Sequence, residues 1–86
     1  MIPTSGYRVI KNATTGEILL RKYVTWEVVM DTPNNARLIV DHGPLTVKFK
    51  KSGLVVATLE SENGRVITEQ RLGYYGKHDT LVFTPR

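Results

Sequence analysis

The chain has 86 residues, no cysteine, and a net charge of +4 from 12 Lys and Arg against 8 Asp and Glu. The missing cysteines exclude disulfides and thiolate metal sites, and no apolar stretch is long enough for a transmembrane helix. The polar start shows no signal peptide, so we expect a cytoplasmic or virion protein without a membrane partner. No linker or repeat is visible, which predicts one domain over 1–86.

The first half of the chain is dominated by a strand-like pattern. A strand is predicted at 7–11, followed by a turn at 12–16 that is rich in residues which bond to the local backbone or accept positive φ. Over 17–30 the even positions are apolar except for Lys22, and the odd positions are mixed, which predicts a long strand. Trp26 belongs to the apolar row and is expected to fill the core with its indole N–H bonded to a carbonyl.

The length of this strand raises a question of shape. Its residues, if fully extended, span roughly 46 Å, whereas a domain of this size is roughly 30 Å across. The strand therefore bends, with Lys22 as the natural place for a bulge, or it projects as an arm that pairs with another subunit. The sequence leaves both alternatives open.

Turn-forming residues divide the second half into short strands. We predict strands at 36–40, 45–50, 54–60, 65–72 and 80–84, separated by turns at 31–35, 41–44, 51–53 and 61–64 and by a loop at 73–79. Pro33 ends the long strand because it supplies no ladder donor, and Asn63-Gly64 favours a tight hairpin turn. The sequence thus predicts an all-β fold, an antiparallel meander of six or seven strands that forms a small barrel or a two-layer sandwich.

The candidate catalytic groups form no recognisable site. His42 and His78 each have an Asp beside them, but neighbours on a strand point to opposite faces, and each His is expected to be solvated in a loop. A metal site needs several ligands at matched spacing, which two distant His do not supply. We therefore expect no catalytic residue, no metal and no cofactor, and a protein that is not an enzyme.

Contact with other protein chains is the leading functional hypothesis. A short chain without disulfides gains stability by oligomerising or by docking onto a partner, and several predicted strands are apolar on both faces, which indicates cover on both sides. We expect a structural or adaptor protein in a homo-oligomer or a larger particle, such as a viral or phage assembly. The predicted partner-binding residues are the outward side of the long strand and the loop at 73–77, namely Arg21, Tyr23, Thr25, Tyr74, Tyr75 and Lys77.

Binding of single-stranded nucleic acid is the alternative. Such proteins combine a basic groove with exposed aromatic side chains on which bases stack. The predicted contacts are Lys48, Lys50, Lys51, Arg71 and Lys77 to phosphate, with Tyr23, Tyr74 and Tyr75 stacking on bases. The glycines around Tyr74 and Tyr75 predict a mobile loop that exposes both rings. The competing interpretation is that a tyrosine caps the barrel and that the lysines protect an edge strand.

Overall fold

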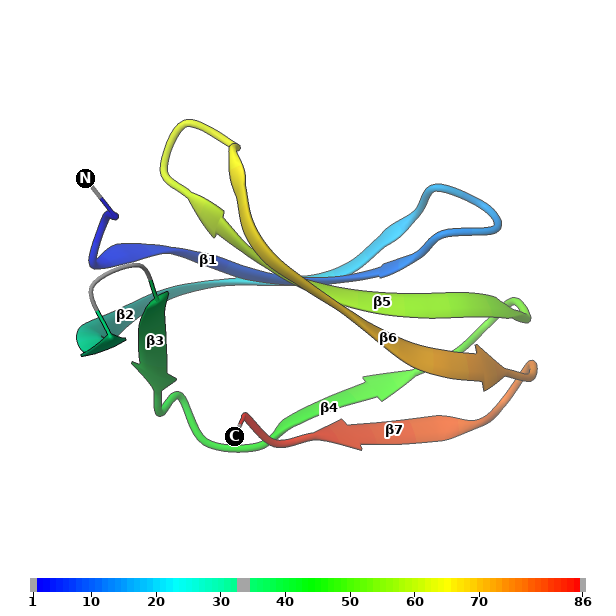
Figure 1. Ribbon diagram of the computed structural model, residues 1–86. Coiled ribbons are helices and arrows are strands. Elements are labelled where there is room, and N and C mark those ends of the chain that lie inside the picture. Colours follow the sequence, from blue (N-terminus) through cyan, green and yellow to red (C-terminus); the bar gives the residue numbers. More distant parts are fainter. Residues whose placement is uncertain (1, 33–34, 86) are drawn as a thin grey trace.

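The strands predicted from the alternating pattern are present in the computed structural model, which describes residues 2–32 and 35–85 (Figure 1). They are β1 (Ser5–Asn12), β2 (Ile18–Thr32), β3 (Asn35–Val40), β4 (Leu45–Lys48), β5 (Gly53–Ser61), β6 (Val66–Tyr75) and β7 (Thr80–Phe83). The all-β prediction is therefore confirmed. Within the described residues, no helix has the length and apolar character needed to cross a membrane.

The strands form two antiparallel sheets. The larger has the order β3-β2-β1-β5-β6, and the smaller consists of β4 and β7. The large sheet curls into a half-barrel, and the small sheet lies across its concave side (Figure 1). Neighbouring strands are mostly consecutive in sequence, as in a meander. The exceptions are the pairings of β1 with β5 and of β4 with β7, each of which joins strands that are not consecutive.

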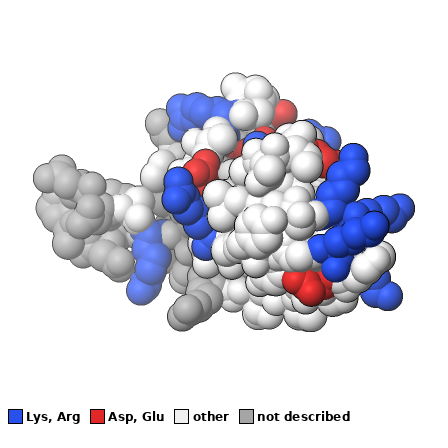
Figure 2. Space-filling model, turned by 90° about the vertical axis from the view of Figure 1, so that its right-hand side faces the viewer, with Lys and Arg blue, Asp and Glu red and all other residues white. Residues whose placement is uncertain are grey.

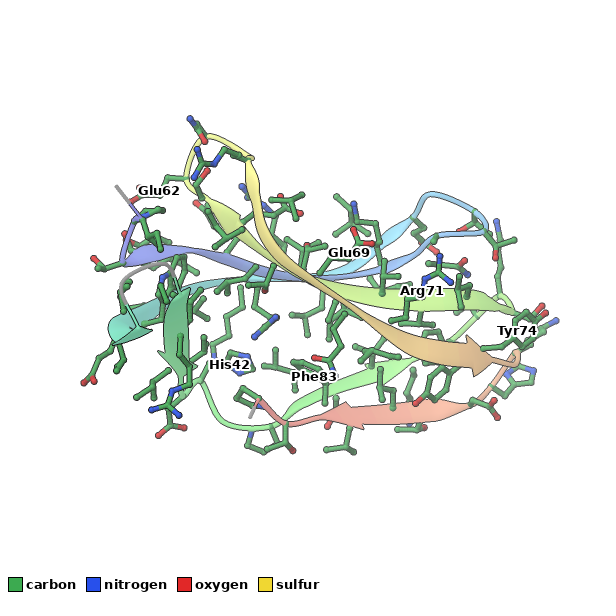
Figure 3. The ribbon with its side chains drawn as sticks, viewed as in Figure 1. His42, Glu62, Glu69, Arg71, Tyr74 and Phe83 are labelled. Atoms are coloured by element: carbon green, nitrogen blue, oxygen red, sulfur yellow. The ribbon has the colours of Figure 1, made fainter. Side chains whose placement is uncertain are left out.

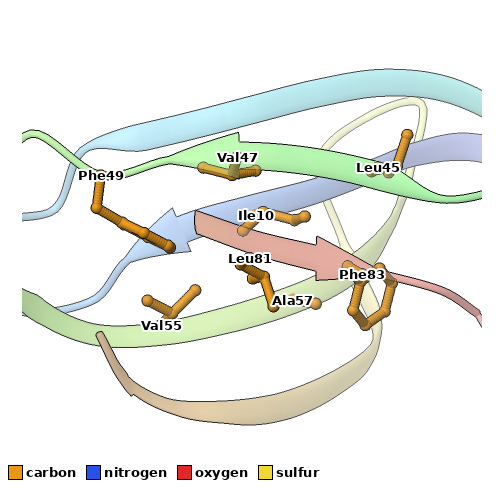
Figure 4. Packing of buried hydrophobic residues seen from close by; sticks show 8 residues of the cluster. All are labelled: Ile10, Leu45, Val47, Phe49, Val55, Ala57, Leu81 and Phe83. Carbon is orange, nitrogen blue, oxygen red and sulfur yellow. The ribbon is translucent and has the colours of Figure 1, made fainter. Parts of the chain in front are cut away.

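The main core lies between the two sheets. Its buried side chains are Ile10, Leu45, Val47, Phe49, Val55, Ala57, Leu81 and Phe83 (Figure 4). The alternation predicted over 45–50 is confirmed, since every odd position there is buried and every even position is exposed. Removing this apolar surface from water stabilises the fold by about 25 cal/mol per Å².

A smaller apolar cluster of Val24, Trp26 and Leu59 lies beside β3. Trp26 is buried, as predicted for a core residue. The expected carbonyl partner is wrong, however, because its buried Nε1 has no hydrogen-bond partner within the described part of the chain. Nε1 of Trp26 is thus a buried donor that none of the described residues satisfies.

The long strand β2 pairs with two strands in succession. Its first half pairs with β1, and its second half, from Trp26 onward, pairs with β3. It continues beyond β1 in an elongated molecule that measures 43 × 22 × 21 Å. The bulge predicted at Lys22 is wrong, since Lys22 pairs regularly with Arg8 and the register shifts between Ile10 and Lys11.

This register shift changes which side chains of β2 face the core. Ile10 pairs with Leu20, whereas Lys11 pairs with Ile18, so Leu19 is the extra residue. Leu19 and Leu20 both pack against the core, but Ile18 is 56% exposed. The sequence pattern predicts that the even positions from Ile18 onward face the core. Because of the bulge, the even positions face the core only from Leu20 onward.

Two of the predicted turns are confirmed. Asn12 ends β1, and the backbone N–H of Gly16 donates to its carbonyl at 2.7 Å. In the turn after β5, the N–H of Gly64 donates to Ser61 O at 2.9 Å, and Gly64 has a φ of 90°. Gly64 thus adopts the left-handed conformation that closes a three-residue hairpin loop. The turn predicted at 31–35 includes residues 33 and 34, which lie outside the described part of the chain.

The loop predicted at 73–79 is wrong in extent. Strand β6 continues through Tyr75, and only 76–79 form a turn. Gly73 explains the difference, because its φ of 107° accompanies a shift in the pairing of β6 with β5. The glycine forms a bulge inside the strand rather than beginning a loop. Tyr74 and Tyr75 are consequently strand neighbours that point to opposite faces.

Candidate binding surfaces

A cluster of aromatic and cationic side chains lies on the convex face of the large sheet. The guanidinium carbon of Arg21 is 3.6 Å from the ring centroid of Tyr7. The Tyr7 and Tyr23 rings meet edge to face, with centroids 5.5 Å apart and planes at 78°. Tyr7 and Tyr23 are paired across β1 and β2, so both project from the same face. We call Tyr7, Arg21 and Tyr23 the outer cluster.

The predicted residues of the long strand all belong to this face. Arg21 and Thr25 are exposed, and Tyr23 is 52% exposed. The structure brings them together with Tyr7, which sequence analysis did not identify. The available signal was its place in the neighbouring strand, but recognising it required the register between β1 and β2.

The two tyrosines at the end of β6 do not form one site. Tyr74 is 71% exposed (Figure 3). Tyr75 packs against the core, where its ring stacks on Phe49 with centroids 5.0 Å apart and planes at 19°. The interpretation in which a mobile loop exposes both rings is therefore wrong for Tyr75, and the competing interpretation, that one of the two tyrosines folds back onto the core, is confirmed for it. Lys77 is exposed in the turn that follows.

The basic residues predicted to contact phosphate are exposed but belong to separate elements. Lys48, Lys50 and Lys51 follow one another around the end of β4, and Arg71 lies on β6. Lys48 and Lys50 line a shallow hollow of about 200 Å³ beside the start of β2. Figure 2 shows Lys and Arg side chains on both sides of this end of the molecule, around a central area that is mostly uncharged.

A cleft of about 420 Å³ lies on the concave side of the half-barrel. Its lining includes Arg8 of β1, Leu38 of β3, Leu59 of β5, Thr68 and Gln70 of β6, and Phe83 of β7. The strands of both sheets therefore contribute to it, and its lining combines apolar walls with a few polar groups. This is the composition typical of small-molecule sites.

Arg8 and His42 form a hydrogen-bonded pair beside this cleft. Arg8 is only 6% exposed, and its Nε donates to Nε2 of His42 at 3.1 Å. Nδ1 of His42 lies 2.7 Å from the carbonyl oxygen of Gly43. These contacts fit a neutral imidazole that carries its proton on Nδ1 and donates it to Gly43. The expectation that His42 is solvated in a loop is therefore wrong.

Phe83 completes the surroundings of the pair. The guanidinium carbon of Arg8 is 5.0 Å from the Phe83 ring centroid. His42 stacks on the same ring with centroids 6.1 Å apart (Figure 3). Burial lowers the pKa of His42 below its ordinary value, and the charges of Arg8 and Lys22 lower it further.

Sequence analysis missed Arg8 because its orientation was not evident. Val9 and Ile10 are both apolar, so the pattern of this short strand does not show which face is inward. The structure places Ile10 in the core, and Arg8, two residues earlier, therefore points to the same concave side.

The described residues contain no group of three or more His, Asp or Glu side chains that could hold a metal ion. Comparison with protein-family models, with curated protein sequences and with solved structures finds no match to this chain.

Proposed function

We propose that this domain is a non-enzymatic structural or adaptor module that binds a second copy of its own chain through the outer cluster. The single observation that carries the proposal is the preformed contact of Arg21 with Tyr7 and of Tyr7 with Tyr23 on a solvent-exposed sheet face. Tyr and Arg are the residue types that most often dominate the binding energy of protein interfaces.

The strands beneath hold the outer cluster in place. β1 lies in the middle of the large sheet and pairs with β2 on one side and β5 on the other. Val9 and Thr58 are paired with each other across β1 and β5, and they are only 2% and 1% exposed. Such a surface loses little conformational entropy on binding, which favours affinity.

The charges of this face favour association with an identical copy. Arg21 lies close to Tyr7, which is paired on its other side with Glu60. Arg21 itself is paired with Val9, so the two opposite charges lie in neighbouring rows of the same face. A two-fold contact places the same patch on both partners, so Arg21 of one copy can face Glu60 of the other.

Single-stranded nucleic acid is the second candidate for the same surface. An exposed tyrosine beside an arginine also provides a stacking face for a base and a cation for phosphate. Tyr23 is half exposed. Its ring contacts the ring of Tyr7, which in turn contacts the guanidinium of Arg21. Tyr75 gives this alternative no support, because its ring packs against Phe49.

Sedimentation velocity over a range of protein concentrations tests the proposal. We expect the wild-type protein to self-associate and the Arg21→Ala/Tyr23→Ala variant to sediment as a monomer. Tyr74→Ala is the matched control, because it removes an exposed tyrosine outside the outer cluster. A wild-type protein that remains monomeric at all concentrations would contradict the proposal.

Titration with a mixed-sequence single-stranded oligonucleotide at low and high salt tests the second candidate. Binding that weakens with salt and is lost in the Arg21→Ala/Tyr23→Ala variant would favour nucleic acid, because each phosphate contact releases counterions. Absence of binding at low salt would remove this candidate.

A further inference from the structure

Arg8 is a buried cation that has no acidic partner among the residues that the structure describes. Its side chain lies in the middle of β1 on the concave side and is 6% exposed. Within residues 2–32 and 35–85, its guanidinium forms no ion pair and makes a single hydrogen bond, from Nε to His42. A buried charge is normally paired, because desolvation without compensation destabilises the folded state.

The hydrogen bond to His42 fixes the orientation of the guanidinium. Nε is the donor that His42 engages, and Nδ1 of His42 is itself held by the carbonyl of Gly43. Among the described residues the two terminal Nη groups have no hydrogen-bond partner. They are the donors that Arg8 offers to the cleft it lines. Two Nη groups on one planar group are suited to an oxyanion with two oxygens in a plane.

The electrostatic surroundings add to the attraction for an anion. Lys22 is paired with Arg8 across β1 and β2, and its charge acts on His42 from the same side. Arg37 of β3 lines the same cleft. The described lining residues include no Asp or Glu, so nothing in this lining opposes the positive charge.

The rest of the cleft fits an apolar body rather than a second anionic group. Leu38, Leu59 and Phe83 supply apolar walls, while Thr68 and Gln70 of β6 supply neutral polar groups. The cleft volume of about 420 Å³ is of the size that small-molecule sites have. A carboxylate held by Arg8, with an aliphatic or aromatic group against the walls, satisfies both parts of this lining.

We propose that the cleft is a binding site for small organic monocarboxylates, with the carboxylate bound by the two Nη groups of Arg8 and the apolar body lying against Leu38, Leu59 and Phe83. This site lies on the concave side of the sheet and the outer cluster on the convex side. The two can therefore be tested, and can fail, independently.

The test is calorimetric titration of the full-length protein with hexanoate, hexanamide and inorganic phosphate. We expect saturable 1:1 binding of hexanoate and at least about tenfold weaker binding of the other two. Hexanamide has the same shape without the charge, and phosphate has charge without an apolar body. Equal binding of hexanoate and hexanamide, preferential binding of phosphate, or no saturable binding of hexanoate would each overturn the proposal.

Variants of Arg8 locate the site. Arg8→Met is expected to weaken hexanoate binding at least about tenfold, and its free energy of unfolding should equal or exceed that of the wild type, because it removes a buried unpaired charge. Arg65→Met is the matched control, since Arg65 is exposed and does not line the cleft. Hexanoate binding that survives in Arg8→Met would overturn the proposal.

A second variant leaves Arg8 in place. Gln70→Glu introduces a carboxylate on the β6 wall, which should compete with the ligand and weaken hexanoate binding about tenfold. Nuclear magnetic resonance of the His42 ring gives a direct readout, because an anion on Arg8 alters the group to which Nε2 is bonded. Unchanged His42 resonances at saturating hexanoate would place the ligand elsewhere and overturn the proposal.

Discussion

The side chain of Asn12 occupies the space that any side chain larger than hydrogen at position 53 would need, and Gly53 leaves this space open. Asn12 is 1% exposed, and its Oδ1 accepts hydrogen bonds from the backbone N–H groups of Thr14 and Thr15 at 2.9 and 3.1 Å. Its Nδ2 donates to the carbonyl of Ser52 at 3.3 Å. One buried amide thus connects the turn after β1 with the turn before β5.

We predict that Asn12→Ala lowers the free energy of unfolding by about 2–3 kcal/mol, because backbone groups lose their partners and a cavity forms. Gly53→Ala should cost a similar amount, since the added Cβ would overlap the Asn12 side chain. The double variant should cost less than the sum of the two, because alanine at position 12 makes room for the new methyl group. Urea unfolding followed by circular dichroism measures all three, and additive costs would contradict the predicted coupling.

The neutral state of His42 predicts a dependence of stability on pH. Its pKa is lowered by burial and by the charges of Arg8 and Lys22, so the unfolded chain binds a proton more readily than the folded one. The contribution of His42 to stability is therefore complete above the ordinary histidine pKa of about 6.5. It decreases as the pH falls from there toward the lowered pKa.

Chemical denaturation between about pH 7.5 and pH 5 measures this dependence, above the range in which most carboxylates titrate. The free energy of unfolding should fall with pH in the wild type and fall less in His42→Gln. His78→Gln is the matched control, because it replaces the second histidine of the chain, an exposed residue of the 76–79 turn. A wild-type slope retained in His42→Gln would contradict the assignment.

Because Nε1 of Trp26 is unsatisfied, we predict that this core position tolerates substitution by phenylalanine. Truncation of a large buried aromatic residue to alanine costs about 3–5 kcal/mol, and an unpaired buried donor itself costs about 1–3 kcal/mol. Trp26→Phe removes this donor while keeping an aromatic ring, so its cost should stay below about 1.5 kcal/mol. Thermal unfolding of Trp26→Phe and Trp26→Ala compares the two. A cost for Trp26→Phe close to that of Trp26→Ala would show that the indole has a partner.

Because Tyr74 and Tyr75 point to opposite faces, we predict that alanine substitution affects stability at Tyr75 but not at Tyr74. Tyr75→Ala removes a ring that stacks on Phe49 and should destabilise the domain by about 2–3 kcal/mol. Tyr74→Ala removes a ring that is 71% exposed and should change stability by no more than about 0.5 kcal/mol. Equilibrium unfolding of the two variants distinguishes this arrangement from a mobile loop, in which both substitutions would be neutral.

The positions of the strands follow from local chemistry and were predictable. The alternation over 45–50 and the turns at 12–16 and 61–64 depend only on nearby residues. The pairing of β1 with β5 was not predictable, because it joins strands that lie far apart in the sequence and no local pattern indicates it. Register shifts such as those beside Leu19 and at Gly73 were not predicted either, because their position depends on how each strand pairs with its neighbour.

For the candidate sites too, residues indicated by a local pattern were predictable, whereas residues brought together by strand pairing were not. Arg21, Tyr23 and Thr25 were identified because the alternation of the long strand shows which residues face outward. Tyr7 joins them only through the pairing of β1 with β2. The cleft depends on side chains from both sheets, so no single segment of sequence indicates it.

Because β2 pairs first with β1 and then with β3, the two ends of the large sheet should differ in how easily they open locally. β3 pairs with the large sheet only through β2, and none of the β3 side chains that the structure describes belongs to the main core. Its amide protons should therefore exchange with solvent by an opening of β3 that leaves β1 and β5 folded, at a lower free energy than global unfolding. Leu38 of β3 lines the cleft, so a bound ligand should slow this exchange and link occupancy of the concave side to the motion of one edge strand.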